Sequence, residues 1–253
     1  MKYQKELDFL VEIVGGAYKS IATEEMKVSD KGAFDNVTNL DFAIEKFMLK
    51  RLAEEFPADI VVSEEFNPDN CLSGRSWTID PIDGTVNMAH QNKLYGVQVA
   101  FLENNDVKAS VIYLPQFGEW FTATKGGGAY LNGKQIVVGD RNLENAMVSL
   151  GDFSHRSEKQ AEEQFELIGR LYKKIGKLRL FGAASIDFAF IASGRTDGMI
   201  MFTKNLWDIA PGWLLVAEAG AKVTNLDGES YQFGMDEIVV TATDEMLKIM
   251  KRK

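Results

Sequence analysis

The sequence has little of the chemistry that depends on sulfur or imidazole. Cys71 is its only cysteine and two of its 253 residues are histidines, so neither an intramolecular disulfide nor a Cys/His zinc site can be assembled. No apolar run approaches the roughly 20 residues that cross a bilayer, and the charged start, Met1 to Asp8, does not fit a signal peptide. We therefore expect a soluble, unprocessed, cytoplasmic protein whose metal ligands are oxygen atoms.

Positive charge is also scarce. Lysine and arginine number 28 against 37 aspartates and glutamates, which gives a net charge of -9. A nonspecific grip on nucleic acid needs clustered cations that meet the phosphates. The sequence therefore predicts a small-molecule substrate, and neither a nucleic-acid polymer nor a membrane as partner.

The chain can bury a full core, since 45% of its residues are hydrophobic. It has no internal repeat, low-complexity tract or Pro/Ser-rich linker. We therefore expect one domain over residues 1–253, with an N-terminal half of about 1–140 and a C-terminal half of about 141–253.

Apolar spacing predicts a mixed α/β (α+β) fold. The expected helices cover residues 7–18, 41–56, 158–175, 185–193 and 209–219. The expected strands cover residues 59–63, 76–80, 97–102, 107–113, 119–124 and 198–202. The strands between 97 and 124 are typical of an antiparallel sheet, and the first two strands end in acidic residues.

The strongest chemical signal is the segment Asp80-Pro81-Ile82-Asp83-Gly84-Thr85, directly after an apolar strand. Pro81 would hold a turn, so that Asp80 and Asp83 converge on one hard cation. Gly84 lets the backbone approach a phosphate, and a helix that begins at Thr85 would offer free N–H groups to the anion. One segment would then supply metal ligands and a phosphate cradle together.

Glu64-Glu65 and Asp208 are the natural additional acids. Clustered carboxylates need cations to offset their repulsion, and two magnesium ions roughly 4 Å apart suit hydrolysis of a phosphate by activated water. Each acid alone has an ordinary explanation: a turn, a solvated strand end, or a helix N-cap for Asp208. The hypothesis of a magnesium-dependent phosphatase depends on the whole set.

Three segments together resemble the inositol monophosphatase family, the lithium-sensitive, magnesium-dependent phosphatases whose superfamily includes fructose-1,6-bisphosphatase. They are Val62-Ser63-Glu64-Glu65, Trp77-Thr78-Ile79-Asp80-Pro81-Ile82-Asp83-Gly84-Thr85-Val86-Asn87 and Trp207-Asp208-Ile209-Ala210-Pro211-Gly212. Motif order and spacing agree from Val37-Thr38-Asn39-Leu40-Asp41 to Glu218-Ala219-Gly220-Ala221. The resemblance implies a layered α/β/α/β/α sandwich, usually a homodimer, that hydrolyses a small phosphate monoester such as inositol 1-phosphate or a related sugar phosphate.

The resemblance also implies roles for residues. Glu64, Asp80 and the Ile82 carbonyl would hold one magnesium, Asp80, Asp83 and Asp208 a second, and a third, weaker ion would share Glu64. Thr85 and Asp41 would orient and deprotonate the attacking water with help from Glu64. The N–H groups of Gly84 and Thr85 would hold the phosphate, with Ala184 and Asp208 on the substrate side. Neither His90 nor His155 needs to act as the general acid.

Lys31 lies in the stretch Lys27–Asn36, where the family carries a mobile loop that closes over the site. An ordinary exposed lysine in a polar loop explains it equally well.

The sequence departs from the family pattern on the substrate side. Met201 stands where animal relatives carry the glutamate that binds inositol hydroxyls, and a thioether cannot replace those hydrogen bonds. Ala183 stands where a serine or threonine is usual. Lys204 could meet a second phosphate or a sugar hydroxyl, or simply face water. The alternatives are therefore a fructose-1,6-bisphosphatase, a nucleotide phosphatase acting on 3′-phosphoadenosine 5′-phosphate or NADP, and a non-catalytic metal or phosphate binder.

Overall fold

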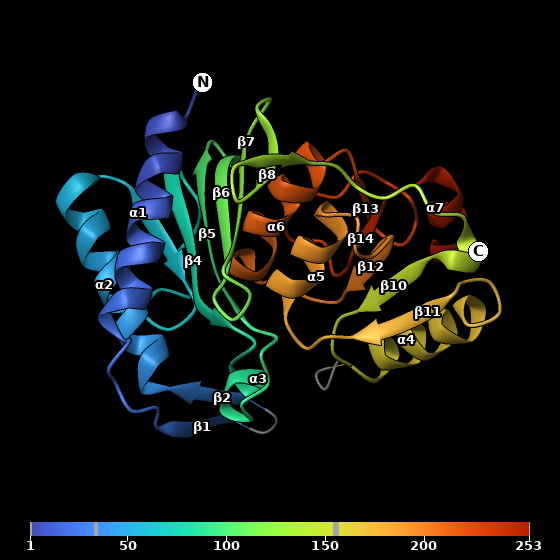
Figure 1. Ribbon diagram of the computed structural model, residues 1–253, viewed down its shortest axis with the longest axis horizontal. Helices are drawn as coiled ribbons and strands as arrows, with labels where there is room; N and C mark the ends of the chain where they lie inside the picture. The colour runs from blue at the N-terminus through green and yellow to red at the C-terminus, as the bar shows by residue number, and fades with distance from the viewer. Residues whose placement is uncertain (1, 33–34, 154–156, 253) are drawn as a thin grey trace.

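The computed structural model describes residues 2–32, 35–153 and 157–252 of the chain. Its helices and sheets are stacked as five layers, which follow one another from left to right in Figure 1. The layers are helices α1 and α2, a seven-stranded sheet, helices α5 and α6, a five-stranded sheet, and helices α4 and α7. The layered α/β/α/β/α sandwich expected from the sequence is confirmed.

The α-helices of the described residues are α1 (Gln4–Ser20), α2 (Asn39–Glu55), α3 (Thr85–Ala89), α4 (Glu158–Leu171), α5 (Ala184–Ala192), α6 (Leu206–Glu218) and α7 (Asp244–Met250). A 3-10 helix covers Leu143–Asn145. None of the helices in these described ranges is both long and apolar enough to cross a membrane.

The larger sheet has seven strands in sequence order. These are β3 (Ile60–Ser63), β4 (Arg75–Asp83), β5 (Gly96–Glu103), β6 (Asp106–Leu114), β7 (Glu119–Thr124), β8 (Gly128–Leu131) and β9 (Lys134–Ile136). Strands β3 and β4 are parallel, and every later neighbour pair is antiparallel. The antiparallel sheet expected between residues 97 and 124 is therefore present.

The smaller sheet has five strands in mixed directions. In spatial order they are β11 (Lys177–Leu180), β10 (Met147–Leu150), β12 (Gly198–Met201), β14 (Ile238–Thr241) and β13 (Lys222–Thr224). A separate hairpin, β1 (Val28–Gly32) and β2 (Asp35–Thr38), lies beside α3 at the bottom of Figure 1.

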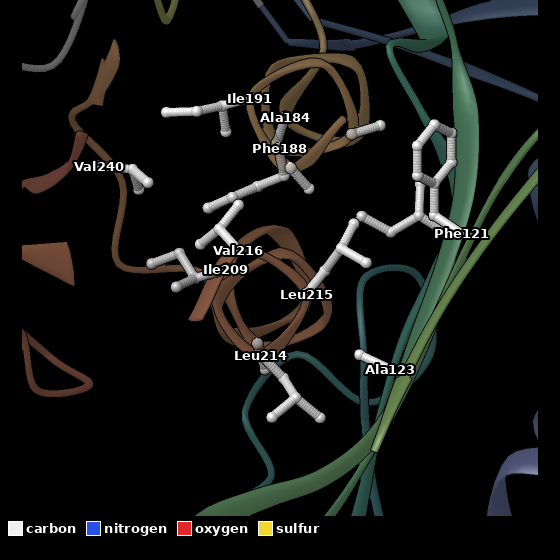
Figure 2. Close-up of a cluster of buried hydrophobic side chains, with 14 of the residues drawn as sticks. Phe121, Ala123, Ala184, Phe188, Ile191, Ile209, Leu214, Leu215, Val216 and Val240 are labelled. Carbon is white, nitrogen blue, oxygen red and sulfur yellow. The ribbon is translucent and has the colours of Figure 1, made fainter. Parts of the chain in front are cut away.

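The middle helix layer is apolar on both sides because it packs between two sheets. Figure 2 shows side chains of α5 and α6 between Phe121 and Ala123 of the larger sheet and Val240 of the smaller one. The two helices approach closely, since a Cβ on Gly212 of α6 would lie only 2.0 Å from Phe188 Cγ of α5. This contact fixes where the first turns of both helices lie, and both turns belong to the site described below.

Four element boundaries differ from the sequence prediction by three residues or more, and several others differ by one or two. Helix α1 begins at Gln4, three residues before the predicted start. Strand β4 continues beyond residue 80 to Asp83, and α6 begins at Leu206, three residues before the predicted start. Helix α4 ends at Leu171 instead of 175, and a turn follows it. Close packing then limits Gly176, where a Cβ would lie 2.7 Å from the carbonyl oxygen of Glu144. The hairpin β1–β2, the short strands β8 to β11, β13 and β14, and helix α7 are absent from the individual elements that the sequence predicts.

Candidate active site

A β-bulge in strand β4 brings two acidic residues to one face of the larger sheet. Asp80 is paired with Gln98 of β5 and Asp83 with Gly96, so three steps along β4 match two steps along β5. Side chains alternate between the faces of a strand, and the extra residue therefore turns Asp80 and Asp83 toward the same side. Pro81 lies inside this strand and not in a turn, which corrects the sequence prediction. A bulge tolerates proline because its residues need no ladder N–H.

Asp83 closes the N-terminus of helix α5. Its carboxylate accepts hydrogen bonds from Ala184 N at 3.1 Å, from Ser185 N at 2.6 Å and from the Ser185 hydroxyl. These N–H groups have no partner inside their own helix, and a carboxylate at that end is also favoured by the helix dipole. The Ala184 amide, predicted to lie on the substrate side, therefore binds Asp83 in this structure.

Gly84 links the bulge to the short helix α3. Its φ of +87° is in the left-handed region, and a Cβ there would lie 2.9 Å from Ala183 Cβ and 3.0 Å from the carbonyl oxygen of Leu94. Only glycine meets both conditions. The helix predicted to begin at Thr85 does so, and it spans five residues.

Thr85 meets Asp41 from a distant part of the chain. Thr85 Oγ1 lies 3.0 Å from Asp41 Oδ1 and 2.8 Å from the Ile82 carbonyl oxygen, and its single proton can be donated to one of them. Asp41 is fully buried at the start of α2, where its other oxygen accepts from the Thr38 N–H in a capping box. The pair predicted to act on water is thus in direct contact.

Glu64 follows strand β3 and is joined to Lys31 of the β1–β2 hairpin. Lys31 Nζ donates to Glu64 Oε1 at 3.1 Å and to Glu65 Oε1 at 2.7 Å. The backbone of this corner is held by the buried Glu45, which accepts from the N–H groups of Glu65 and Phe66. Lys31 is therefore not an unpaired exposed lysine, because it contacts two acids at the end of strand β3.

Asp208 enters from the first turn of α6. It is the third residue of that helix, and Asn205 holds the N-cap position that Asp208 was a candidate for. Its Oδ2 accepts from Thr203 Oγ1 at 3.0 Å and from Asn205 Nδ2 at 3.1 Å. These two contacts hold the Asp208 carboxylate at the start of α6.

Electrostatics tie four of these acids into one cluster. Burial raises the pKa of Asp80 well above its usual range, and the charges of Glu64, Asp83 and Asp208 raise it further. Burial also raises the pKa of Glu64, to about 8, with Lys31 acting in the opposite direction. Carboxylates in such proximity resist ionisation until a cation joins them.

The donor set fits a hard divalent cation. Asp80 Oδ1 is buried and has no hydrogen-bond partner in the described parts of the chain, and an orphaned carboxylate oxygen is costly unless a cation or donor meets it. Oxygen-only ligands are what magnesium prefers. Among the described residues no three carboxylate, imidazole or thiol groups are already arranged to hold an ion. Lys31 on Glu64 and the α5 amides on Asp83 occupy oxygens that an ion would need.

The remaining predicted residues have different surroundings. Met201 is 8% exposed and belongs to the hydrophobic core around helices α5 and α6, called the middle core below. Its side chain packs against Gly151. Lys204 forms an ion pair with Asp236 at 2.6 Å. His90 is exposed at the end of α3. His155, and Ala33 and Phe34 of the Lys27–Asn36 stretch, lie outside the described residues.

Two polar residues of the site make contacts for which the sequence analysis predicts no role: Asn87, which ends the quoted motif, and Gln98, which lies outside the motifs. Asn87 Nδ2 donates to the carbonyl oxygens of Leu94 and Phe181, both at 2.8 Å, and so ties α3 to the loop before α5. Gln98 Nε2 donates to Asp80 Oδ2 at 3.2 Å. A lone glutamine within the apolar run Gly-Val-Gln-Val-Ala-Phe-Leu was the signal that could have identified Gln98.

The layered α/β/α/β/α sandwich and its cluster of buried carboxylates fit a class of phosphoric monoester hydrolases that the comparisons identify. The family model described as "Inositol monophosphatase family" matches residues 4–252. The chain belongs to the inositol monophosphatase family and is a phosphoric monoester hydrolase, as the motifs predicted.

Individual relatives agree with this assignment. The inositol monophosphatase of Dictyostelium discoideum is 34% identical over 230 residues, which cover 89% of this chain and 85% of the relative. The fructose-1,6-bisphosphatase/inositol-1-monophosphatase of Thermotoga maritima is 31% identical over 223 residues, which cover 87% of this chain and 84% of the relative. A solved inositol monophosphatase structure from Thermotoga maritima superposes with a TM-score of 0.86 at 29% identity, over 98% of this chain and 97% of that one.

Proposed function

We propose that this chain hydrolyses a small phosphate monoester, inositol 1-phosphate or a related sugar phosphate, with two magnesium ions and in some states a third. One observation carries the magnesium assignment. Asp80 Oδ1 is a buried carboxylate oxygen without a partner among the described residues, and burial together with the acids around it keeps the pKa of Asp80 high. A divalent cation satisfies the oxygen and offsets the repulsion together.

The proposed ligands are Glu64, Asp80, the Ile82 carbonyl, Asp83 and Asp208. Bound magnesium would supply Lewis acidity for the phosphate and its leaving oxygen. To bind an ion, Asp83 would have to give up part of its contact with the α5 amides. In the same way, Glu64 would have to give up part of its contact with Lys31. Without the ion, these two carboxylates therefore bind groups of the chain itself.

The chain's own contribution to the reaction is positioning and proton transfer. The Thr85 hydroxyl, held between Asp41 and the Ile82 carbonyl, would orient the attacking water, and Asp41 with Glu64 would take its proton. The N–H groups of Gly84 and Thr85 would hold the phosphate at the start of α3. Ala184 and Asp208 would face the alcohol side of the substrate.

The substrate need not be inositol. Met201 has its side chain in the core, so it offers no polar contact to the hydroxyls of a polyol. The relative from Thermotoga maritima is named for both fructose 1,6-bisphosphate and inositol 1-phosphate, and we extend the same breadth to this chain.

A nucleotide substrate is the second candidate, and a cavity favours it. A cavity of about 620 Å³ opens beside Lys204 and Leu206 and is lined by Trp213, Tyr231 and Phe233. Its aromatic walls could stack a base, and Lys204 could meet a second phosphate. This candidate predicts hydrolysis of 3′-phosphoadenosine 5′-phosphate or of the 2′-phosphate of NADP.

The test is phosphate release from inositol 1-phosphate, fructose 1,6-bisphosphate, 3′-phosphoadenosine 5′-phosphate and NADP, with and without magnesium. Asp83→Asn should abolish release while the far-ultraviolet circular dichroism stays unchanged. The control is Asp106→Asn, which removes an acid that pairs with Lys108 and Lys125. Unchanged turnover in Asp83→Asn would refute the ligand assignment, and no release from any substrate would favour a non-catalytic binder.

We also propose that residues 1–253 act as one domain in a cytoplasmic, lithium-inhibited homodimer. The middle core joins residues from both halves of the chain, from Ala100 to Val240, which supports a single folding unit. Sedimentation equilibrium tests the dimer, and lithium titration of turnover tests the inhibition.

A further inference from the structure

We infer that Gln98 is a positioning residue that holds Asp80 with one carboxylate oxygen turned to the magnesium site. The inference rests on the proposed function, because it concerns a ligand of the proposed ion. The neutral amide of Gln98 would thereby increase the affinity of the site for that ion.

The contact is built into the sheet. Gln98 of β5 is directly opposite Asp80 of β4 in the antiparallel register, and it is the last such pair before the bulge. Gln98 Nε2 donates to Asp80 Oδ2 at 3.2 Å, and the two residues are 0% and 1% exposed. Opposite residues of an antiparallel pair have Cβ atoms about 4.5–5.5 Å apart. The strand pairing therefore keeps the amide in place without help from a loop.

The amide decides which carboxylate oxygen remains available. An ionised carboxylate only accepts hydrogen bonds, so the NH2 end of Gln98 must face Asp80. Oδ2 is then occupied, whereas Oδ1 has no partner within the described ranges. Without Gln98 the carboxylate could rotate about its terminal torsion, which has a broad energy minimum.

Packing alone gives no reason for a glutamine here. The next residues on the same face of β5, Ala100 and Leu102, are apolar members of the middle core. Gln98 Oε1 is buried and lacks a partner in the portion of the chain described, so the glutamine carries a desolvation cost that an apolar residue would avoid. Groups that orient a metal ligand are where proteins accept such a cost.

The experiment measures magnesium binding, apart from turnover. Isothermal titration calorimetry with MgCl2 is run on the full chain, on Gln98→Leu and on Gln98→Met, which keeps the length of the side chain. We expect the dissociation constant to rise about 10- to 100-fold in both variants. The metal-free melting temperature should stay within a few degrees of the unchanged chain, and turnover should recover at saturating magnesium.

Thr78→Val is the matched control. Thr78 lies two residues before Asp80 on the same face of β4, is 0% exposed, and its hydroxyl has no partner among the described side chains and backbone. The substitution removes a buried polar group of that face without touching Asp80. Its magnesium affinity should equal that of the unchanged chain.

Each result decides between two explanations. Unchanged affinity in Gln98→Leu and Gln98→Met, with magnesium binding and hydrolysis intact in the parent chain, overturns the role of Gln98 and leaves the proposed function standing. Loss of folding in both variants without metal also overturns it, since the role would then be structural. A parent chain that neither binds magnesium nor releases phosphate refutes the proposed function, and the inference falls with it.

Discussion

Lys31 Nζ donates to Glu64 Oε1 at 3.1 Å, and this ion pair fastens the β1–β2 hairpin to the end of strand β3. Burial lowers the pKa of Lys31, but Glu64 and Glu65 more than offset that effect, so the ammonium stays charged. In the metal-free chain Lys31 therefore supplies positive charge to an acid that is also a proposed magnesium ligand.

The first prediction follows from this competition. Lys31→Met should lower the magnesium dissociation constant about two- to fivefold, because Glu64 no longer has to give up an ion pair when it binds the metal. This factor corresponds to the free energy of a partly exposed ion pair. Calorimetric titration measures it, with Lys125→Met, which loses a pair to Asp106, as the control. Weaker binding in Lys31→Met would show that the lysine assists the ion instead of replacing it.

The second prediction concerns the Thr85 hydroxyl. Thr85→Val removes the group that joins α3 to Asp41, and the turnover number should fall about 10²- to 10⁴-fold, as is typical when a proton-transfer contact is lost. Thr85→Ser keeps the hydroxyl and should retain most of the turnover. Equal turnover in the valine and serine variants would exclude a catalytic role for this oxygen.

The third prediction concerns pH and Asp187 of α5. This residue is 1% exposed, and neither carboxylate oxygen has a hydrogen-bond partner in the described structure. Burial raises the pKa of Asp187 well above its ordinary value of 3.8. The polar side chain of Ser149 lowers this pKa to a smaller extent, and the negative charges of Asp83 and Asp152 raise it. An acid with a higher pKa in the folded state stabilises folding below about pH 4 and loses this contribution as the pH rises through the folded-state pKa.

Asp187→Asn should therefore raise the free energy of unfolding at pH 8 by about 1 kcal/mol or more, and change it little near pH 4. Urea unfolding of the metal-free protein, followed by circular dichroism, measures the difference. Asp69→Asn, at an exposed position, serves as the control and should have little effect at either pH. A loss of stability at pH 8 in Asp187→Asn would mean that the charged carboxylate has a partner in solution.

The fourth prediction uses two helical glycines with opposite surroundings. A Cβ on Gly212 would lie 2.0 Å from Phe188 Cγ, whereas one on Gly169 of α4 would meet nothing within 4 Å. Gly212→Ala should lower the free energy of unfolding by about 1–3 kcal/mol through overpacking, and Gly169→Ala should raise it by about 0.5–1 kcal/mol. Denaturant unfolding of both variants checks the pair, and equal effects would contradict the packing of α5 on α6.

The sequence predicts the acids of the site better than it predicts their geometry. Glu64, Asp80, Asp83 and Asp208 belong to short motifs, and the structure brings their charges together. The contact between Thr85 and Asp41 spans 44 residues, and no local pattern predicts it; it came from the resemblance alone. The ligand roles themselves remain predictions.

What the sequence does not predict depends on strand register. In the sequence, the proline at position 81 favours a turn. The structure has a bulge there instead, and the extra residue of a bulge can be recognised only from the pairing with β5. The same pairing places Gln98 beside Asp80. The contact of Lys31 with Glu64 likewise depends on how the β1–β2 hairpin docks, which local sequence does not encode.

The bulge makes the strand pairing at this point of the chain more important than the identity of the residues between the two acids. Replacing Ile82 by another apolar residue leaves Asp80 and Asp83 on one face of β4. If residues 80 to 83 paired regularly with β5, the odd spacing of three would turn Asp83 to the opposite face of the sheet, away from the α5 amides that it now binds. During divergence, this segment would therefore tolerate apolar substitutions only as long as the irregular pairing with β5 is kept.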